Sequence, residues 1–253
     1  MPFRSPARMQ LGAVALLSVL LLTGCVPPGS PDTTDASTSA LPAVEEPTSA
    51  PGPSAAAVPA TSATAIGDRL AISPQPGADA VQTLSNPQES GAPLTLLVVA
   101  RHDDWLEVSL PQRPNGSTGW VREGDVALHA LVYSLEVSTG QNTLTLRENA
   151  QQVKTYPVAT GTGGTPTPHG SFFLTELIEP TNEGYGPYAF GVSAFSEVLT
   201  SFGGGPGQIG LHGTDDEGSI GQSASHGCIR MSNDDITELA GRLPLGTPIT
   251  IGP

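Results

Sequence analysis

The sequence predicts a mainly β protein, in which a small β-barrel is followed by a larger β-rich domain with one short helix. Short apolar runs bounded by Gly, Pro, Asn and Asp recur along the chain, which is typical of strands joined by turns. The 30 glycines and 25 prolines disfavour long helices. Only residues 234–243 show helical spacing, with Ser232 or Asn233 as the expected cap.

Residues 1–25 have the features of a secretory signal. Arg4 and Arg8 precede an apolar stretch at 11–22, which is too short to span a bilayer comfortably. Cys25 follows Leu-Thr-Gly, an ending that resembles the lipobox of bacterial lipoproteins and implies a membrane anchor through a lipid on Cys25. An ordinary signal peptide with an incidental cysteine is the alternative. We expect an exported lipoprotein, on the outer face of the cytoplasmic membrane or in the cell wall or periplasm.

Residues 26–65 are expected to form a disordered tether. They consist largely of Pro, Ser, Thr and Ala, and they contain no lysine, arginine or aromatic residue. Such a segment cannot bury enough apolar surface to offset the entropy lost on ordering. If Cys25 is acylated, the second of the two cysteines, Cys228, has no disulfide partner.

The charge balance excludes one class of partner. The chain carries 10 basic and 24 acidic residues, a formal net charge of −14. Nucleic-acid binding requires a basic face, so we expect no nucleic-acid partner.

Residues 66–128 are predicted to form the small barrel. Residues 94–100 are almost continuously apolar, and residues 105–110 alternate apolar with polar side chains, as a half-buried strand does. A turn-rich connector leads to a further strand at Trp120. The order Trp-Leu-x-Val, turn, Gly-Trp-Val resembles the bacterial Src-homology-3-like barrel, a domain often found on cell-wall proteins. We expect Trp105 and Trp120 to lie in its core.

Residues 130–252 are predicted to form the second domain. Apolar or alternating runs predict its strands at 131–137, 143–147, 153–159, 171–175, 209–212 and 247–251. The Thr-Pro-Thr-Pro-His-Gly run at 165–170 predicts a fixed extended turn, because its prolines remove backbone donors. Residues 179–207 form an irregular connector rich in glycine and aromatic rings, among them Tyr188. It is either a lid or substrate wall, or ordinary core packing.

Cys228 is the candidate nucleophile. It lies within Ser-His-Gly-Cys-Ile-Arg at 225–230, and a second His-Gly pair stands at His212 and Gly213. A thiol attacks as the thiolate, and its ordinary pKa of about 8.5 leaves it largely protonated at neutral pH without help from an imidazole or backbone dipoles. The histidines and the unobstructed backbone at Gly227 offer both kinds of help. A buried structural cysteine is the alternative.

Four pieces of sequence, taken in order, resemble the catalytic domain of the bacterial L,D-transpeptidases. They are the turn at 165–170, His-Gly at 212–213, Ser-His-Gly-Cys-Ile-Arg-Met-Ser-Asn at 225–233 and Gly-Thr-Pro at 246–248. The resemblance implies a mostly β fold that cradles the cysteine and acts on peptidoglycan stem peptides, as donor and acceptor, outside the cytoplasmic membrane. We expect neither a cofactor nor a bound metal.

The resemblance also implies a role for each site residue. Cys228 would attack the carbonyl of the third stem residue and expel D-alanine, and an acceptor amine would resolve the thioester into a cross-link. His212 would be the base, oriented by the Gly213 carbonyl, and the N–H groups of Gly227 and Cys228 would form the oxyanion hole. Substrate-binding roles are expected for Ser225, His226, Arg230 and Tyr188. His226 is expected to share an extended strand with Cys228.

Three other functions remain open at this point. The first is an L,D-carboxypeptidase, in which water resolves the same thioester. The second is a non-catalytic, wall-binding lipoprotein, which reaction with a carbapenem would distinguish from an enzyme. The third is a zinc site, because thiolate and imidazole are suitable ligands. Its candidate ligands are His212, His226, Cys228 and His169.

Overall fold

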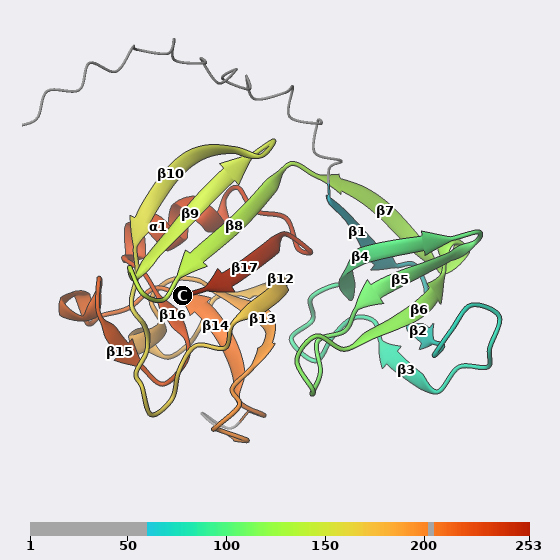
Figure 1. Cartoon of the computed structure of the whole chain (residues 1–253), viewed down its shortest axis with the longest axis horizontal. Coiled ribbons are helices and arrows are strands. Elements are labelled where there is room, and N and C mark those ends of the chain that lie inside the picture. The colour runs from blue at the N-terminus through green and yellow to red at the C-terminus, as the bar shows by residue number, and fades with distance from the viewer. Residues whose placement is uncertain (1–59, 202–204) are drawn as a thin grey trace, which may run out of the picture. The chain divides into compact units, whose positions relative to one another are not determined.

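The computed structural model describes residues 60–201 and 205–253, which are built mainly from two β-sheets (Figure 1). The signal segment, Cys25 and the tether up to residue 59 lie outside the described residues. Within the described part of the chain, no helix is both long and apolar enough to cross a bilayer.

The first sheet has five antiparallel strands in the order β6-β5-β4-β1-β7. Its strands are β1 (Ala60–Ala65), β4 (Thr95–His102), β5 (Trp105–Ser109), β6 (Thr118–Arg122) and β7 (Val126–Leu131), with the short helix η1 (Glu123–Asp125) between the last two. A hairpin of β2 (Arg69–Ile72) and β3 (Gln82–Ser85) accompanies the sheet. The core is mainly aliphatic and includes fully buried Leu96, Leu106, Val108 and Val121, together with the ring of Phe173 from β12 (Gly170–Ile178).

The predicted boundary between tether and barrel is wrong by one strand. Residues 60–65 are not part of a tether, because they form β1, which lies between β4 and β7 in the sheet. The strand is built from Ala, Thr and Ser, whose small side chains fit between two neighbouring strands but give no apolar run in the sequence. Backbone pairing, with Ala63 opposite Leu96 and Leu128, is what places this segment.

The expectation that the tryptophans fill the barrel core is also wrong. Trp105 and Trp120 are only half-buried. The guanidinium of Arg122 lies 4.5 Å from the centroid of the Trp105 ring, an arrangement suited to a cation–π contact on the surface of the sheet. Aliphatic side chains on the opposite face of the strands supply the core.

The second sheet has eight strands in the order β10-β9-β8-β17-β12-β13-β14-β16. In chain order these are β8 (Tyr133–Ser138), β9 (Thr143–Glu148), β10 (Gln151–Pro157), β12 (Gly170–Ile178), β13 (Ala189–Phe195), β14 (Gln208–His212), β16 (Ile229–Arg230) and β17 (Pro248–Gly252). A separate parallel pair consists of β11 (Thr160–Gly161) and β15 (Ser223–Ser225). Two short helices, η2 (Glu183–Tyr185) and η3 (Glu217–Ser219), lie in the loops. Figure 1 shows β17 between β8 and β12.

Two elements of the second domain differ from the sequence-based expectation. The strand predicted at 131–137 is divided at Val132, because β7 pairs with β1 as far as Leu131 and β8 then joins the second sheet. The boundary between the domains therefore falls at Val132. The irregular connector at 179–207 contains the regular strand β13, whose Phe190 and Val192 are fully buried.

Side chains of the first domain form hydrogen bonds with the second. The Arg113 guanidinium donates to the carbonyls of Pro206 (2.7 Å), Ser196 (2.8 Å) and Leu199 (3.0 Å). Asn115 both donates to the Phe195 carbonyl and accepts from the Phe195 N–H, each at 2.8 Å. These bonds fix the backbone at the end of β13, which would otherwise leave carbonyls without partners.

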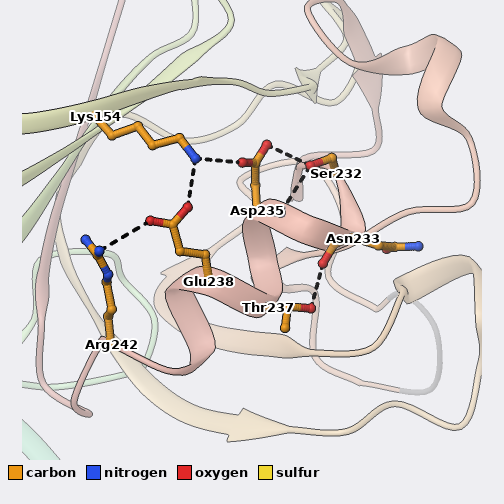
Figure 2. A network of polar contacts seen from close by, with 7 residues as sticks. All are labelled: Lys154, Ser232, Asn233, Asp235, Thr237, Glu238 and Arg242. Carbon is orange, nitrogen blue, oxygen red and sulfur yellow. Dashed lines mark hydrogen bonds and ion pairs between the residues drawn. The ribbon is translucent and has the colours of Figure 1, made fainter.

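Helix α1 (Asn233–Ala240) is capped as its sequence predicts, with Ser232 as the cap. The Ser232 hydroxyl accepts a hydrogen bond from the Asp235 N–H. Lys154 on β10 contacts two carboxylates of the helix, Asp235 at 3.1 Å and Glu238 at 2.7 Å (Figure 2). The other face of α1 buries Ile236 and Leu239 in the core of the second sheet. The helix is thereby held to the sheet from both sides.

Candidate active site

Cys228 lies in a tight turn between β15 and β16. The turn depends on Gly227, whose φ of 123° is rarely accessible to residues with a side chain. The Ser225 hydroxyl donates to the Cys228 carbonyl at 2.5 Å and accepts from the Gly227 N–H at 3.0 Å. Ser225 is almost completely buried, so it holds the turn from within and does not face a substrate.

The extended turn at 165–170 supports the cysteine turn from behind. The Thr167 hydroxyl donates to the Gly227 carbonyl at 2.9 Å and accepts from the Gly161 N–H at 2.8 Å. Both prolines of this turn lack a backbone donor, which leaves a threonine hydroxyl to make the connection. Two segments that are distant in the sequence therefore fix the backbone on which the thiol is mounted.

His212 ends β14 and is 3% exposed. Its Nδ1 lies 2.6 Å from the Gly213 carbonyl, which confirms the predicted orientation by a backbone carbonyl. A carbonyl can only accept, so Nδ1 carries the proton and Nε2 is left as the acceptor. This is the tautomer that a general base requires.

Asn233, the first residue of α1, holds the loop that follows His212. Its Oδ1 accepts the Thr214 N–H at 3.0 Å and lies directly over the backbone of Gly213 and Gly186. A Cβ atom added at either glycine would strike this oxygen. In Figure 2 the Asn233 side chain points away from the Lys154 contacts, so one helix end serves both the ion-pair network and the histidine loop.

Tyr185 is a site residue that the sequence analysis did not select. Its ring lies over the imidazole of His212, with 4.4 Å between the ring centroids and 33° between the planes. The expected residue, Tyr188, instead packs against the core of the sheet and accepts the Gly213 N–H through its carbonyl at 3.3 Å. Two residues separate the two tyrosines in an irregular segment, and no periodic pattern tells which one faces the histidine.

Burial favours the neutral forms of His212 and Cys228. Burial lowers the pKa of His212 to about 4, opposed by the hydrogen bond to Gly213 and reinforced by the Arg230 charge. Burial also raises the pKa of the Cys228 thiol above its ordinary value, although the Gly210 N–H, 3.4 Å from the sulfur, and the Arg230 charge act in the opposite direction. These two pKa shifts favour a neutral thiol beside a neutral imidazole over a thiolate–imidazolium pair.

Two pockets meet at Cys228 and His212. The first, which we call the Arg230 pocket, has a volume of about 300 Å³ and is also lined by Tyr185, Asp215 and His226. The second, the Glu176 pocket, has a volume of about 440 Å³ and is walled by residues of β12, β13 and β14. A substrate that spans both pockets passes directly over the thiol.

The remaining predicted residues divide between the site and its support. His226 and Arg230 line the Arg230 pocket, as expected for residues that meet a substrate. His226 is exposed and lies in the turn, so the expectation that it shares an extended strand with Cys228 is wrong. The Gly227 N–H is occupied by Ser225, whereas no hydrogen bond within the described residues takes up the Cys228 N–H. Of the two predicted oxyanion donors, Cys228 is the accessible one.

The fourth candidate zinc ligand, His169, does not belong to this cluster. It is exposed, and its Nε2 forms a hydrogen bond with the Thr139 hydroxyl at 2.9 Å. Among residues 60–201 and 205–253, no three His, Cys, Asp or Glu side chains are grouped as metal ligands. The geometry gives the zinc hypothesis no support.

A buried imidazole and a thiol in one pocket of a β-sheet domain define the class of site, and comparison with known proteins identifies the family. Residues 132–251 match YkuD, the L,D-transpeptidase catalytic domain. The YkuD protein of Bacillus subtilis (strain 168) is 37% identical over 123 residues, which cover 49% of this chain and 68% of that protein. YqjB of the same strain is 35% identical over 110 residues, covering 38% of this chain and 57% of that protein.

Similarity to solved structures is weaker. An L,D-transpeptidase from Mycobacterium smegmatis is 17% identical, with a TM-score of 0.42 and coverage of 63% of this chain and 90% of that one. On the family match and the similarity to the Bacillus protein, this chain belongs to the YkuD family of L,D-transpeptidase catalytic domains.

Proposed function

We propose that this protein is a peptidoglycan L,D-transpeptidase in which Cys228 is the nucleophile. The observation that carries the proposal is the shared pocket of Cys228 and His212, with the imidazole fixed as the Nδ1–H tautomer by Gly213. The membership of the chain in a family that acts on stem peptides supplies the substrate class.

Acylation begins with a neutral thiol. As the sulfur attacks the carbonyl of the third stem residue, Nε2 of His212 takes the thiol proton, so that no free thiolate has to exist in the buried site. The S–C bond forms, the C–N bond to the terminal D-alanine breaks, and the imidazolium returns the proton to the leaving amine. The Cys228 N–H is the available donor toward the oxyanion.

Transfer follows the same path in reverse. An acceptor amine attacks the thioester, a new C–N bond forms, and the S–C bond breaks. His212 takes the amine proton and returns it to the sulfur. Arg230 in the adjoining pocket offers a guanidinium suited to a stem-peptide carboxylate, and His226 lies where it can position the peptide.

The decisive variant is Cys228→Ala, with intact mass spectrometry and D-alanine release as measurements. Wild type should gain the mass of an acyl group from a tetrapeptide donor or a carbapenem, and the variant should gain none. Because the substitution removes only a small polarisable group, the melting temperature should stay close to that of wild type. D-alanine release by the variant would refute the nucleophile assignment. Hydrolysed tripeptide without any dimer would instead identify a carboxypeptidase.

The proposal places this chemistry outside the cytoplasmic membrane. It is supported by the secretory signal at 1–25 and by the lipobox-like Leu-Thr-Gly-Cys ending, although these residues lie outside the described structure. We expect wild type in the membrane fraction and Cys25→Ala either released or unprocessed. Recovery of wild type without a lipid on Cys25 would contradict the anchor.

A further inference from the structure

The two pockets beside the thiol differ in their charged side chains: a guanidinium is present in one and absent from the lining of the other. The Arg230 pocket contains a guanidinium, although Asp215 also lies on its wall. Among the described residues that line the Glu176 pocket, Glu176 is the only carboxylate. Its other walls are apolar or uncharged, so this carboxylate sets the electrostatic character of the pocket.

The backbone gives Glu176 room to reach across the neighbouring strand. Glu176 on β12 is paired with Gly191 on β13. A Cβ atom added at Gly191 would lie 2.9 Å from both Cγ and Oε1 of Glu176, so the carboxylate occupies the space that a side chain would take. Within the described residues, no salt bridge and no hydrogen bond engages this carboxylate, which leaves it available to a ligand cation.

The chemistry of transfer tells which part of the substrate each pocket receives. The leaving D-alanine and the incoming acceptor both present an amine to the same carbonyl and exchange a proton with the same His212. Microscopic reversibility therefore places both amines on one side of the thioester. D-alanine carries a carboxylate one carbon from its amine, which matches Arg230. The Glu176 pocket then receives the acyl side, which is the third residue of the donor.

We propose that Glu176 binds a side-chain ammonium on the third residue of the donor stem, and so selects stems that carry a diamino acid with a free terminal amine at that position. The inference rests on the proposed function and adds the specificity residue that the family match does not supply. Glu176 is a binding residue, and it takes no part in proton transfer.

The test compares two donors that differ only in that charge. One is a tetrapeptide with lysine as its third residue, and the other carries Nε-acetyl-lysine there. A charge-assisted hydrogen bond in a half-enclosed pocket should favour the lysine donor in wild type by about 10- to 100-fold in kcat/KM for D-alanine release. Glu176→Gln should lower kcat/KM for the lysine donor to nearly that of the acetylated donor, mainly through KM.

Two controls separate this inference from the function on which it rests. Glu197→Gln removes an exposed carboxylate outside the Glu176 pocket and should keep the full preference for lysine. Acylation of Cys228 by a carbapenem, which has no third stem residue, should proceed at the wild-type rate in Glu176→Gln. Equal turnover of both donors by wild type, or a preference that survives in Glu176→Gln, would overturn the role of Glu176 and leave the proposed function intact. Failure of wild type to turn over any stem peptide would overturn the proposed function.

Discussion

The two His-Gly doublets have the same sequence and lie in different environments. His212 is buried at the end of a sheet strand, with its tautomer set by Gly213 and its ring covered by Tyr185. His226 is exposed in a turn. The turn requires a glycine at position 227, because residues with a side chain rarely adopt its φ of 123°. The comparison shows that burial and a fixed hydrogen bond distinguish the two histidines, although their dipeptide sequence is the same.

The strongest test of this difference replaces each histidine in turn. His212→Ala removes the proton acceptor, so acylation by a tetrapeptide should fall by about 10²–10⁴-fold. His226→Ala leaves the reacting pair intact and should reduce kcat/KM by less than about tenfold, mainly through KM. Single-turnover acylation and steady-state rates measure both effects. A larger loss in His226→Ala would exchange the two roles.

The glycine that follows His212 gives the second test. Gly213→Ala places a methyl group against the Asn233 side chain and should displace the loop that sets the His212 tautomer. A shift of about 1 Å at the base is expected to lower acylation by about 10²-fold. Gly241→Ala, near the end of α1, is the matched control, because the added Cβ would make only ordinary contacts there, 3.7 Å from the Glu238 and Thr237 carbonyl oxygens. If Gly213→Ala were acylated at the wild-type rate, the loop would be shown to tolerate movement.

A third test uses pH and stability instead of activity. Because the pKa of His212 is lowered from 6.5 to about 4, the unfolded chain binds a proton in this interval and the folded protein does not. Stability should therefore decrease as the pH falls from about 6.5 to about 4, by about 3 kcal/mol from this group. Urea unfolding at several pH values measures the slope. The slope should become shallower in His212→Gln, and an unchanged slope in that variant would contradict the assignment to His212.

The smallest expected effect concerns the support behind His212. Lys154 joins β10 to α1, whose first residue, Asn233, holds the His212 loop (Figure 2). The ion pairs are largely exposed, so Lys154→Met should cost at most about 1 kcal/mol of unfolding free energy and less than about fivefold in acylation. Denaturant unfolding and single-turnover rates provide the measurements. A much larger kinetic effect would show that the histidine depends on the whole network.

The sequence predicted the strands and motifs that carry strong local signals. Alternating side chains located β5, β9 and β14, and the two His-Gly motifs located the thiol and the imidazole that share a pocket. It did not predict β1, because Ala, Thr and Ser gain their strand conformation from pairing with β4 and β7. The sequence also did not predict Tyr185, which lies in an irregular segment. It did not predict Glu176 either, because the space for its carboxylate depends on Gly191 in the neighbouring strand.

Strand β17 has a consequence for the order in which this protein folds. It pairs in parallel with β8 and antiparallel with β12, and so it joins the three strands on one side of the second sheet to the four on the other. Its partner Leu135 is far from Ile249 in the sequence, and closing so long a loop is slow. We therefore expect β14 and β16, the strands next to the site, to join the β8–β10 meander late, with docking of β17 as the rate-limiting event in refolding.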